Sequence, residues 1–256
     1  MRIFAVSDIH VDHEVNARWF NGLSEVDFTS DYLILAGDIS HVLAEIEAVF
    51  DRASRKFARV FYVPGNHDLW LRNETQFASS LDKFDAVLDL ADDVGISTEA
   101  HHEDRLSIVP LFGWYDYSFG APGNILKSAW SDYRLCKWPQ GHDDASVTRR
   151  FLAMNEPLPD MPAGNKVISF SHFLPRIDVM PRRIPPHRHF VYPVLGSDSI
   201  DAQVRRLSSH IHVYGHSHVN RNVTIDGVTY INNAYGYPKE TRISAKRLVV
   251  IHSDQD

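Results

Sequence analysis

The chain has 256 residues, a formal net charge of −7 and a single cysteine, Cys136. With 44% apolar residues it can bury a full core as one domain, and one cysteine excludes an internal disulfide framework. The negative charge argues against a long nucleic acid as partner, because binding to its backbone normally needs a basic face. No apolar stretch approaches the roughly 20 residues that cross a bilayer, so we expect a cytoplasmic protein without a membrane partner.

Five apolar runs of strand length each end in polar residues that can bind a metal. They are residues 3–6, 32–36, 60–63, 167–170 and 211–214. Continuous apolar runs are typical of central strands that are covered on both faces, and α/β proteins bind ligands at the carboxyl ends of such strands.

Helical periodicity lies between these runs, and β patterns follow them. The expected helices are residues 42–57, 77–90 and 199–209. Near the end, Asp226-Gly227 separates two alternating runs and predicts a hairpin, and residues 248–251 predict a further strand. This order predicts an α/β fold of two packed sheets flanked by helices.

Two segments look like additions inside a single domain that spans residues 1–256. Residues 114–161 are rich in Trp, Tyr, Gly and Pro, with one helical stretch at 146–154. Residues 173–194 carry five prolines among arginines and histidines. Both follow expected strand ends, so we expect them to shape the substrate site.

The residues at the five strand ends form a constellation with metal-binding chemistry. Singly each is weak evidence, since an aspartate after a strand can cap a helix and a lone histidine is more often structural. Together they place metal-binding residues directly after each of five apolar runs, and chance would not produce this arrangement five times. The groups are Asp8-x-His10, Gly37-Asp38, Gly65-Asn66-His67-Asp68, Ser171-His172 and Gly215-His216-x-His218.

These donors are nitrogen and oxygen atoms without a thiolate. Such a set favours manganese, iron or zinc, with cobalt as a further option. The donors outnumber what one ion needs and include a carboxylate that can bridge, so we expect two divalent transition metal ions.

The ordered motifs from Asp8 to His218 resemble those of the calcineurin-like metallophosphoesterases. The resemblance implies a four-layer αββα sandwich with two mixed sheets and a dinuclear centre. It implies that Asp8, His10 and His218 hold one metal, that Asn66, His172 and His216 hold the other, and that Asp38 bridges both. His67 would face the scissile phosphate as a catalytic residue and would bind no metal.

The chemistry expected of such a site is hydrolysis of phosphate esters. A hydroxide bridging two metals can attack phosphorus while the metals neutralise the phosphate oxygens. A protonated His67 could stabilise the oxyanion or protonate the leaving alkoxide.

The sequence around Asp38 departs from that of the protein phosphatases. Their Gly-Asp-x-Val-Asp-Arg-Gly motif is replaced here by Gly37-Asp38-Ile39-Ser40-His41-Val42. The phosphodiesterase branch of the family is the closer match, so we expect a phosphodiesterase for a small, nucleotide-like phosphate ester. The alternatives are a broad-specificity phosphomonoesterase and, less favoured, a nuclease or a non-catalytic scaffold. Oligomeric state is not predicted.

Candidate substrate contacts come from the first strand ends and from residues 173–194. The arginines of that segment could clamp a second phosphate, or the segment could be a proline-stiffened surface loop or subunit contact. Aromatic residues 114–119 could stack a nucleobase, although local core is the commoner role of such clusters. The substrate candidates are Asp12, His41, Arg176, Arg182, Arg183 and Arg188.

Overall fold

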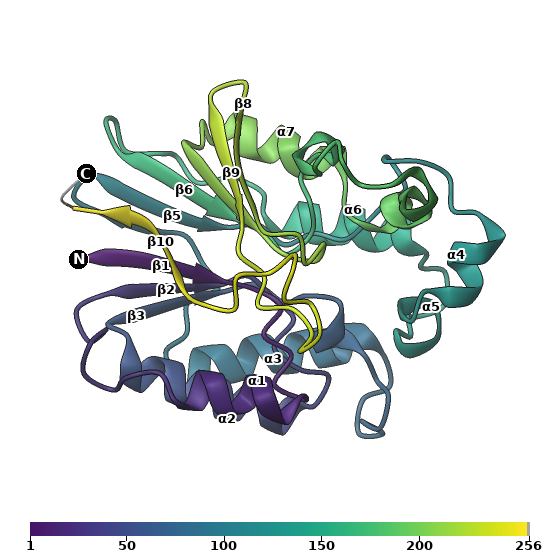
Figure 1. Ribbon diagram of the computed structural model, residues 1–256, viewed down its shortest axis with the longest axis horizontal. Helices are drawn as coiled ribbons and strands as arrows, with labels where there is room; N and C mark the ends of the chain where they lie inside the picture. The colour runs from purple at the N-terminus through teal and green to yellow at the C-terminus, as the bar shows by residue number, and fades with distance from the viewer. Residues whose placement is uncertain (255–256) are drawn as a thin grey trace.

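The computed structural model describes residues 1–254 as two β-sheets packed face to face, each covered by helices on its outer side (Figure 1). The predicted sandwich is therefore confirmed. The first sheet has the order β10-β1-β2-β3, and β1 to β3 are parallel. Its strands are β1 (Arg2–Val6), β2 (Tyr32–Leu35), β3 (Arg59–Tyr62) and the antiparallel β10 (Val249–Ser253).

The second sheet has the order β4-β5-β6-β7-β9-β8, with four parallel strands between two antiparallel edge strands. The predicted Asp226-Gly227 hairpin joins β8 to β9. The strands are β4 (His101–Glu103), β5 (Leu106–Pro110), β6 (Lys166–Phe170), β7 (Ile211–Tyr214), β8 (Arg221–Ile225) and β9 (Val228–Asn232).

Three apolar layers hold the four structural layers together. Successive side chains of a strand point to opposite faces. In β1, Ile3 and Ala5 therefore pack between the two sheets, while Phe4 and Val6 face the helices of the first sheet. This double burial is the reason the central strands read as continuous apolar runs.

The helices of the first sheet follow its strands. In α2, the side chains of Ile46, Val49 and Phe50 recur at helical spacing and are buried. A reciprocal pair of hydrogen bonds between Ser79 and Asp82 starts α3. The helices on this face are α1 (Glu14–Asn21), α2 (Leu43–Lys56) and α3 (Ser80–Asp93). The apolar periodicity of the sequence does not predict α1.

The two segments that look like additions lie at the carboxyl ends of the parallel strands (Figure 1). They contribute α4 (Asn124–Ala129), α5 (Asp132–Leu135), α6 (Asp144–Met154) and the 3-10 turns η2 (Ile177–Val179) and η3 (Pro186–Val194). α7 (Asp198–Arg206) follows them and covers the second sheet with α6. Trp114 and Tyr115 are fully buried, so they are local core and not a base-stacking surface. None of the helices within residues 1–254 has the length and apolarity of a membrane span.

Candidate metal centre

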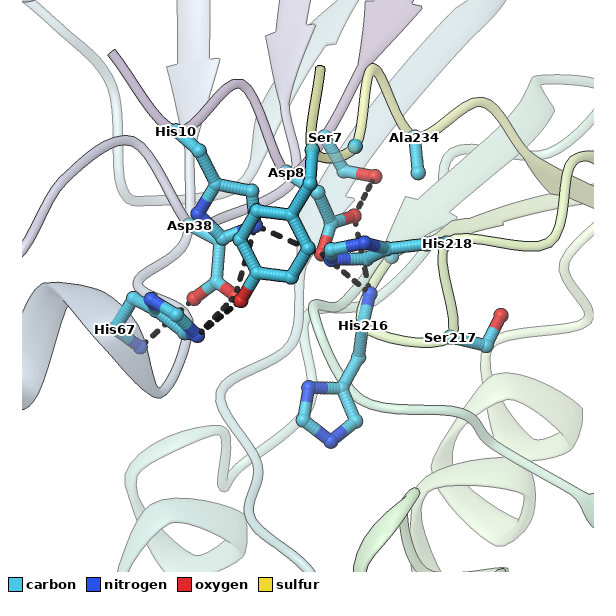
Figure 2. A network of polar contacts seen from close by, with 12 residues as sticks. Ser7, Asp8, His10, Asp38, His67, His216, Ser217, His218 and Ala234 are labelled. Carbon is cyan, nitrogen blue, oxygen red and sulfur yellow. Dashed lines mark hydrogen bonds and ion pairs between the residues drawn. The ribbon is translucent and has the colours of Figure 1, made fainter. Parts of the chain in front are cut away.

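The seven predicted metal ligands come together where the carboxyl ends of the two sheets meet. Figure 2 shows Asp8, His10, Asp38, His216 and His218 among them. Asp8, His10, Asp38 and Asn66 follow strands of the first sheet. His172, His216 and His218 follow strands of the second. All seven are at least nine-tenths buried. The site therefore joins the two halves of the sandwich.

Five of these residues have a left-handed backbone, which side-chain-bearing residues adopt rarely. Asp8, His10, Asp38, His216 and His218 have φ between 47° and 64°. Such strain persists only where the surrounding structure imposes it, and it concentrates at functional sites. The backbone leaves each strand and turns its side chain back toward one point.

Two glycines permit this convergence. At Gly37, a Cβ atom would lie 2.5 Å from Nδ1 of His172, and its φ is +83°. At Gly65, a Cβ atom would lie 2.6 Å from the backbone nitrogen of Asp38 and 2.8 Å from Cε1 of His172. Real Cβ atoms do not approach so closely, so both positions require glycine.

The side chains form two donor groups that share Asp38. One consists of Asp8, His10, Asp38 and His218, and the other of Asp38, His172 and His216. Nε2 of His10 lies 3.1 Å from Nε2 of His218. In the second group, Nε2 of His172 lies 3.2 Å from Nδ1 of His216.

The hydrogen bonds of three histidines fix which ring nitrogen faces the centre. His172 donates from Nδ1 to the Ala36 carbonyl over 2.9 Å, and His216 donates from Nε2 to the Val194 carbonyl, also over 2.9 Å. His218 donates from Nδ1 to a Glu240 carboxylate oxygen at 2.6 Å. Because these oxygens accept, the opposite nitrogen of each ring keeps its lone pair for a metal.

Electrostatics also fit a pair of cations. Nε2 of His172 and Nδ1 of His216 both carry free lone pairs, and at 3.2 Å they repel unless a cation lies between them. Burial, with the nearby Asp8 and Asp68 carboxylates, raises the pKa of Asp38 well above its usual 3.8. A positive ion would remove the repulsion between the ring nitrogens and would stabilise the ionised form of Asp38. The residues present therefore fit a dinuclear metal site.

Imidazoles within the centre are held neutral. Burial lowers the pKa of His10 well below 6.5, and burial lowers that of His216 to about 3. His218 differs: burial opposes its charge, yet Asp8 and Glu240 together raise its pKa to about 9. A divalent ion would take the place of that proton.

Asp68 supports the centre instead of joining it. Its carboxylate accepts hydrogen bonds from the backbone N–H groups of Gly65, Asp38, Ile39 and Ser40, and from the Tyr62 hydroxyl. These bonds lock the two loops that carry Asp38 and Asn66. Both carboxylate oxygens of Asp68 are thereby occupied by hydrogen bonds within the protein.

Asp132 and Glu240 were missed by the sequence analysis. Asp132, in α5, accepts from Nδ2 of Asn66 at 2.8 Å and from the indoles of Trp70 and Trp130, each at 2.7 Å. The Asn66 amide is therefore oriented with Oδ1 toward His172, 3.1 Å away. No local pattern marks either acid, since Asp132 begins a helix of only four residues and Glu240 lies in an irregular segment.

His67 lies beside both donor groups and belongs to neither. Its ring stacks on Trp70 at 3.5 Å between centroids, and Nε2 lies 3.2 Å from the Tyr237 hydroxyl. Burial lowers the pKa of His67 well below 6.5. The three side chains face a pocket of about 330 Å³. Its lining also includes Trp130, Leu195 and the donors Asp38, Asn66, His216 and His218.

The six candidate substrate contacts are not brought together. Asp12 and His41 lie near each other at the edge of the centre, with 3.9 Å between Oδ2 of Asp12 and Nδ1 of His41. Arg176 is paired with Asp178 and Asp226. Arg182, Arg183 and Arg188 are exposed on the segment before and within η3, and none of them lines the pocket.

This fold and this arrangement of donors define a class of protein. Residues 1–220 match the family model of calcineurin-like phosphoesterases. The chain belongs to that family and is a metal-dependent phosphoric ester hydrolase.

Individual relatives resemble the chain over between about half and all of its length. An [acyl-carrier-protein] phosphodiesterase, PptH, of Mycobacterium tuberculosis is 28% identical over 264 residues, which cover 94% of this chain and 79% of that protein. The crystal structure of phosphopantetheinyl hydrolase (PptH) from the same organism superposes with a TM-score of 0.82 at 25% identity, covering 100% of this chain and 97% of that one. An uncharacterized protein, L509, of Acanthamoeba polyphaga mimivirus is 29% identical over 54% of this chain and 52% of its own length.

Proposed function

We propose that the protein is a dinuclear phosphodiesterase that releases phosphopantetheine from an acyl carrier protein. The observation that carries this proposal is the similarity to PptH over 94% of the chain, which includes the segments that wall the pocket. This substrate replaces the nucleotide-like ester that the sequence suggested. It remains a small phosphodiester within the same chemistry.

Asp8, His10 and His218 would hold one metal ion, Asn66, His172 and His216 the other, and Asp38 both. The shared position of Asp38 and the orientation of the ring nitrogens support this assignment. The donor set suits manganese, iron, zinc or cobalt. When bound, two such ions lower the pKa of a water for attack on phosphorus and neutralise the phosphate oxygens.

The chain's own residues would orient the ester. His67 faces the pocket, the Tyr237 hydroxyl lies 3.2 Å from its Nε2, and Trp70 fixes the plane of its ring. The indole of Trp130 and the Leu195 side chain form an apolar wall for the part of the substrate beyond the phosphate. Segments 114–161 and 173–194, inserted in a single domain, would thus determine substrate choice.

Manganese-loaded protein should release phosphopantetheine from holo-acyl carrier protein, which mass spectrometry of both products detects. It should also hydrolyse bis(p-nitrophenyl) phosphate faster than p-nitrophenyl phosphate, and Asp38→Asn should abolish both activities. A preference for the monoester would support a phosphomonoesterase instead. Metal binding without turnover of any ester would support a scaffold.

Replacement of His67 separates its catalytic role from metal binding. We expect His67→Ala to keep two metals per chain, measured by elemental analysis, and to lose turnover by about 100-fold or more. Loss of metal together with activity would make His67 a ligand or a structural residue.

The single cysteine, Cys136, also supports a reducing compartment, and a cytoplasmic location is part of this proposal.

A further inference from the structure

A second, more open hollow lies between α4 and η3. It has a volume of about 470 Å³ and a mostly apolar lining that includes Phe119, Leu126, Tyr192 and Pro193. Two further residues of its lining are unusually exposed for apolar side chains: Ile125 by 71% and Phe190 by 40%. Clustered exposed apolar groups mark surfaces that another molecule covers. We call this hollow the α4–η3 groove.

The groove and the metal-site pocket share their walls. In η3, Phe190 and Tyr192 line the groove while Val191, between them, lines the pocket. In α4, Leu126 lines the groove while Ala129, one turn later, lines the pocket. A molecule bound in the groove would therefore lie beside the mouth of the pocket.

Exposed cations adjoin the groove on both sides, although the whole chain carries a net charge of −7. Lys127 directly follows the lining residue Leu126 in α4, and Arg188 directly precedes the lining residue His189 in η3. Within residues 1–254 neither makes an ion pair, whereas Arg176 is neutralised by Asp178 and Asp226. Unpaired cations beside an apolar contact are complementary to an acidic protein surface, and they speed its association.

We propose that the α4–η3 groove docks an acidic face of the acyl carrier protein while the phosphopantetheinyl arm of that protein enters the pocket. This inference rests on the function proposed above. A substrate group attached to a folded protein brings its carrier to the mouth of the pocket, and the groove is the apolar, basic surface that adjoins it. Recognition of the carrier is thereby separated from the chemistry at the metals.

The decisive experiment compares two variants with the same change in charge. Lys127→Glu/Arg188→Glu reverses one cation on each side of the groove. Arg59→Glu/Arg105→Glu reverses two exposed cations at the amino ends of β3 and β5, away from the site. Each manganese-loaded variant is assayed on holo-acyl carrier protein and on bis(p-nitrophenyl) phosphate, and unfolding temperatures verify that both fold.

We expect the groove variant to lose at least about tenfold in kcat/KM on the carrier protein, mainly through KM, with the diester rate unchanged. Salt should lower the wild-type value toward that of the variant, because screening weakens the same attraction. Ile125→Ser, at an exposed position that folding does not need, should also raise KM for the carrier protein alone.

Other results would overturn the inference in distinguishable ways. Equal activity of both double variants on the carrier protein would mean that the groove is not its docking site. Wild-type turnover of the diester without turnover of the carrier protein would reject the proposed function itself. Self-association of the wild type that Ile125→Ser abolishes would assign the groove to a second copy of the chain.

Discussion

At the scale of single residues, Tyr237 contributes to the site without being marked in the sequence. Its ring stacks on His10 at 4.5 Å between centroids, and its hydroxyl lies 3.2 Å from Nε2 of His67. A hydroxyl can donate to or accept from an imidazole, so it can hold either tautomer of His67 in place. Tyr237 also lines the pocket that His67 faces.

Removal of the Tyr237 hydroxyl should slow the reaction without loss of bound metal. We expect Tyr237→Phe to lower kcat about tenfold, or about 1.4 kcal/mol in the barrier, with metal content unchanged. Tyr235→Phe is the matched control, because its ring packs on Trp19 and lies away from His67. Unchanged kcat in Tyr237→Phe would show that the hydroxyl does not position His67.

His212 is a residue-scale determinant of stability. Burial lowers its pKa from 6.5 to about 3, and the hydroxyls of Ser169 and Ser171 bond its two ring nitrogens. Between pH values of about 3 and 6.5, His212 is therefore protonated in the unfolded chain and neutral in the folded chain. The stability that neutral His212 contributes is full above pH 6.5 and is lost as the pH falls toward 3.

We expect His212→Gln to reduce this pH dependence. Below pH 6.5 the wild-type free energy of unfolding should fall by about 1.4 kcal/mol per pH unit more steeply than that of the variant. Urea titrations of both metal-stripped proteins between pH 4.5 and 7.5 measure the two free energies of unfolding. The contributions of the other titrating groups cancel when one is subtracted from the other. Parallel pH profiles would contradict a neutral His212 in the fold.

At the scale of elements, the strands and their ends are predictable because their physics is local. Buried parallel strands need continuous apolar runs, and ligand-bearing turns follow them, so Asp8, Asp38 and His172 could be located from the sequence. The left-handed backbone of the ligands and the hydrogen bonds from Asp132 and Glu240 depend on contacts between distant segments. Periodicity carries no signal for such contacts, and the same holds for the short helices α1, α4 and α5.

The loop after β3 shows how closely these elements must approach. Gly65→Ala would place a Cβ 2.6 Å from the backbone nitrogen of Asp38, so the two loops must separate. We expect at least tenfold weaker metal affinity and a loss of about 1–3 kcal/mol in stability, the usual cost of overpacking. Calorimetric metal titration and urea unfolding measure these two effects.

Gly123→Ala is the control for this substitution, because its Cβ would meet nothing within 4 Å. Metal affinity of Gly65→Ala equal to that of Gly123→Ala would mean that the approach of the two loops does not shape the site.

At the scale of the whole molecule, the candidate metal centre joins two sheets that also meet through apolar packing and through polar contacts such as that of Tyr32 with Glu103. Four of the seven donor residues come from the first sheet and three from the second. Their buried carboxylates and crowded imidazoles oppose folding when no cation balances them, since a charge without a partner is costly to bury. We therefore expect metal binding to stabilise the entire sandwich and not only to support activity.

Removal of metal should lower the unfolding temperature in one cooperative transition. Each ion present at about 1,000 times its Kd stabilises the fold by about 4 kcal/mol, and for a chain of this size 1 kcal/mol shifts Tm by about 2–4 °C. We expect chelation to lower Tm by more than about 10 °C and manganese to restore it. Calcium should not, because it prefers all-oxygen sites and this centre offers four imidazoles. An unchanged Tm after complete chelation would mean that the two sheets hold this geometry without metal, and that the strained loops owe their conformation to Asp68 and the surrounding hydrogen bonds alone.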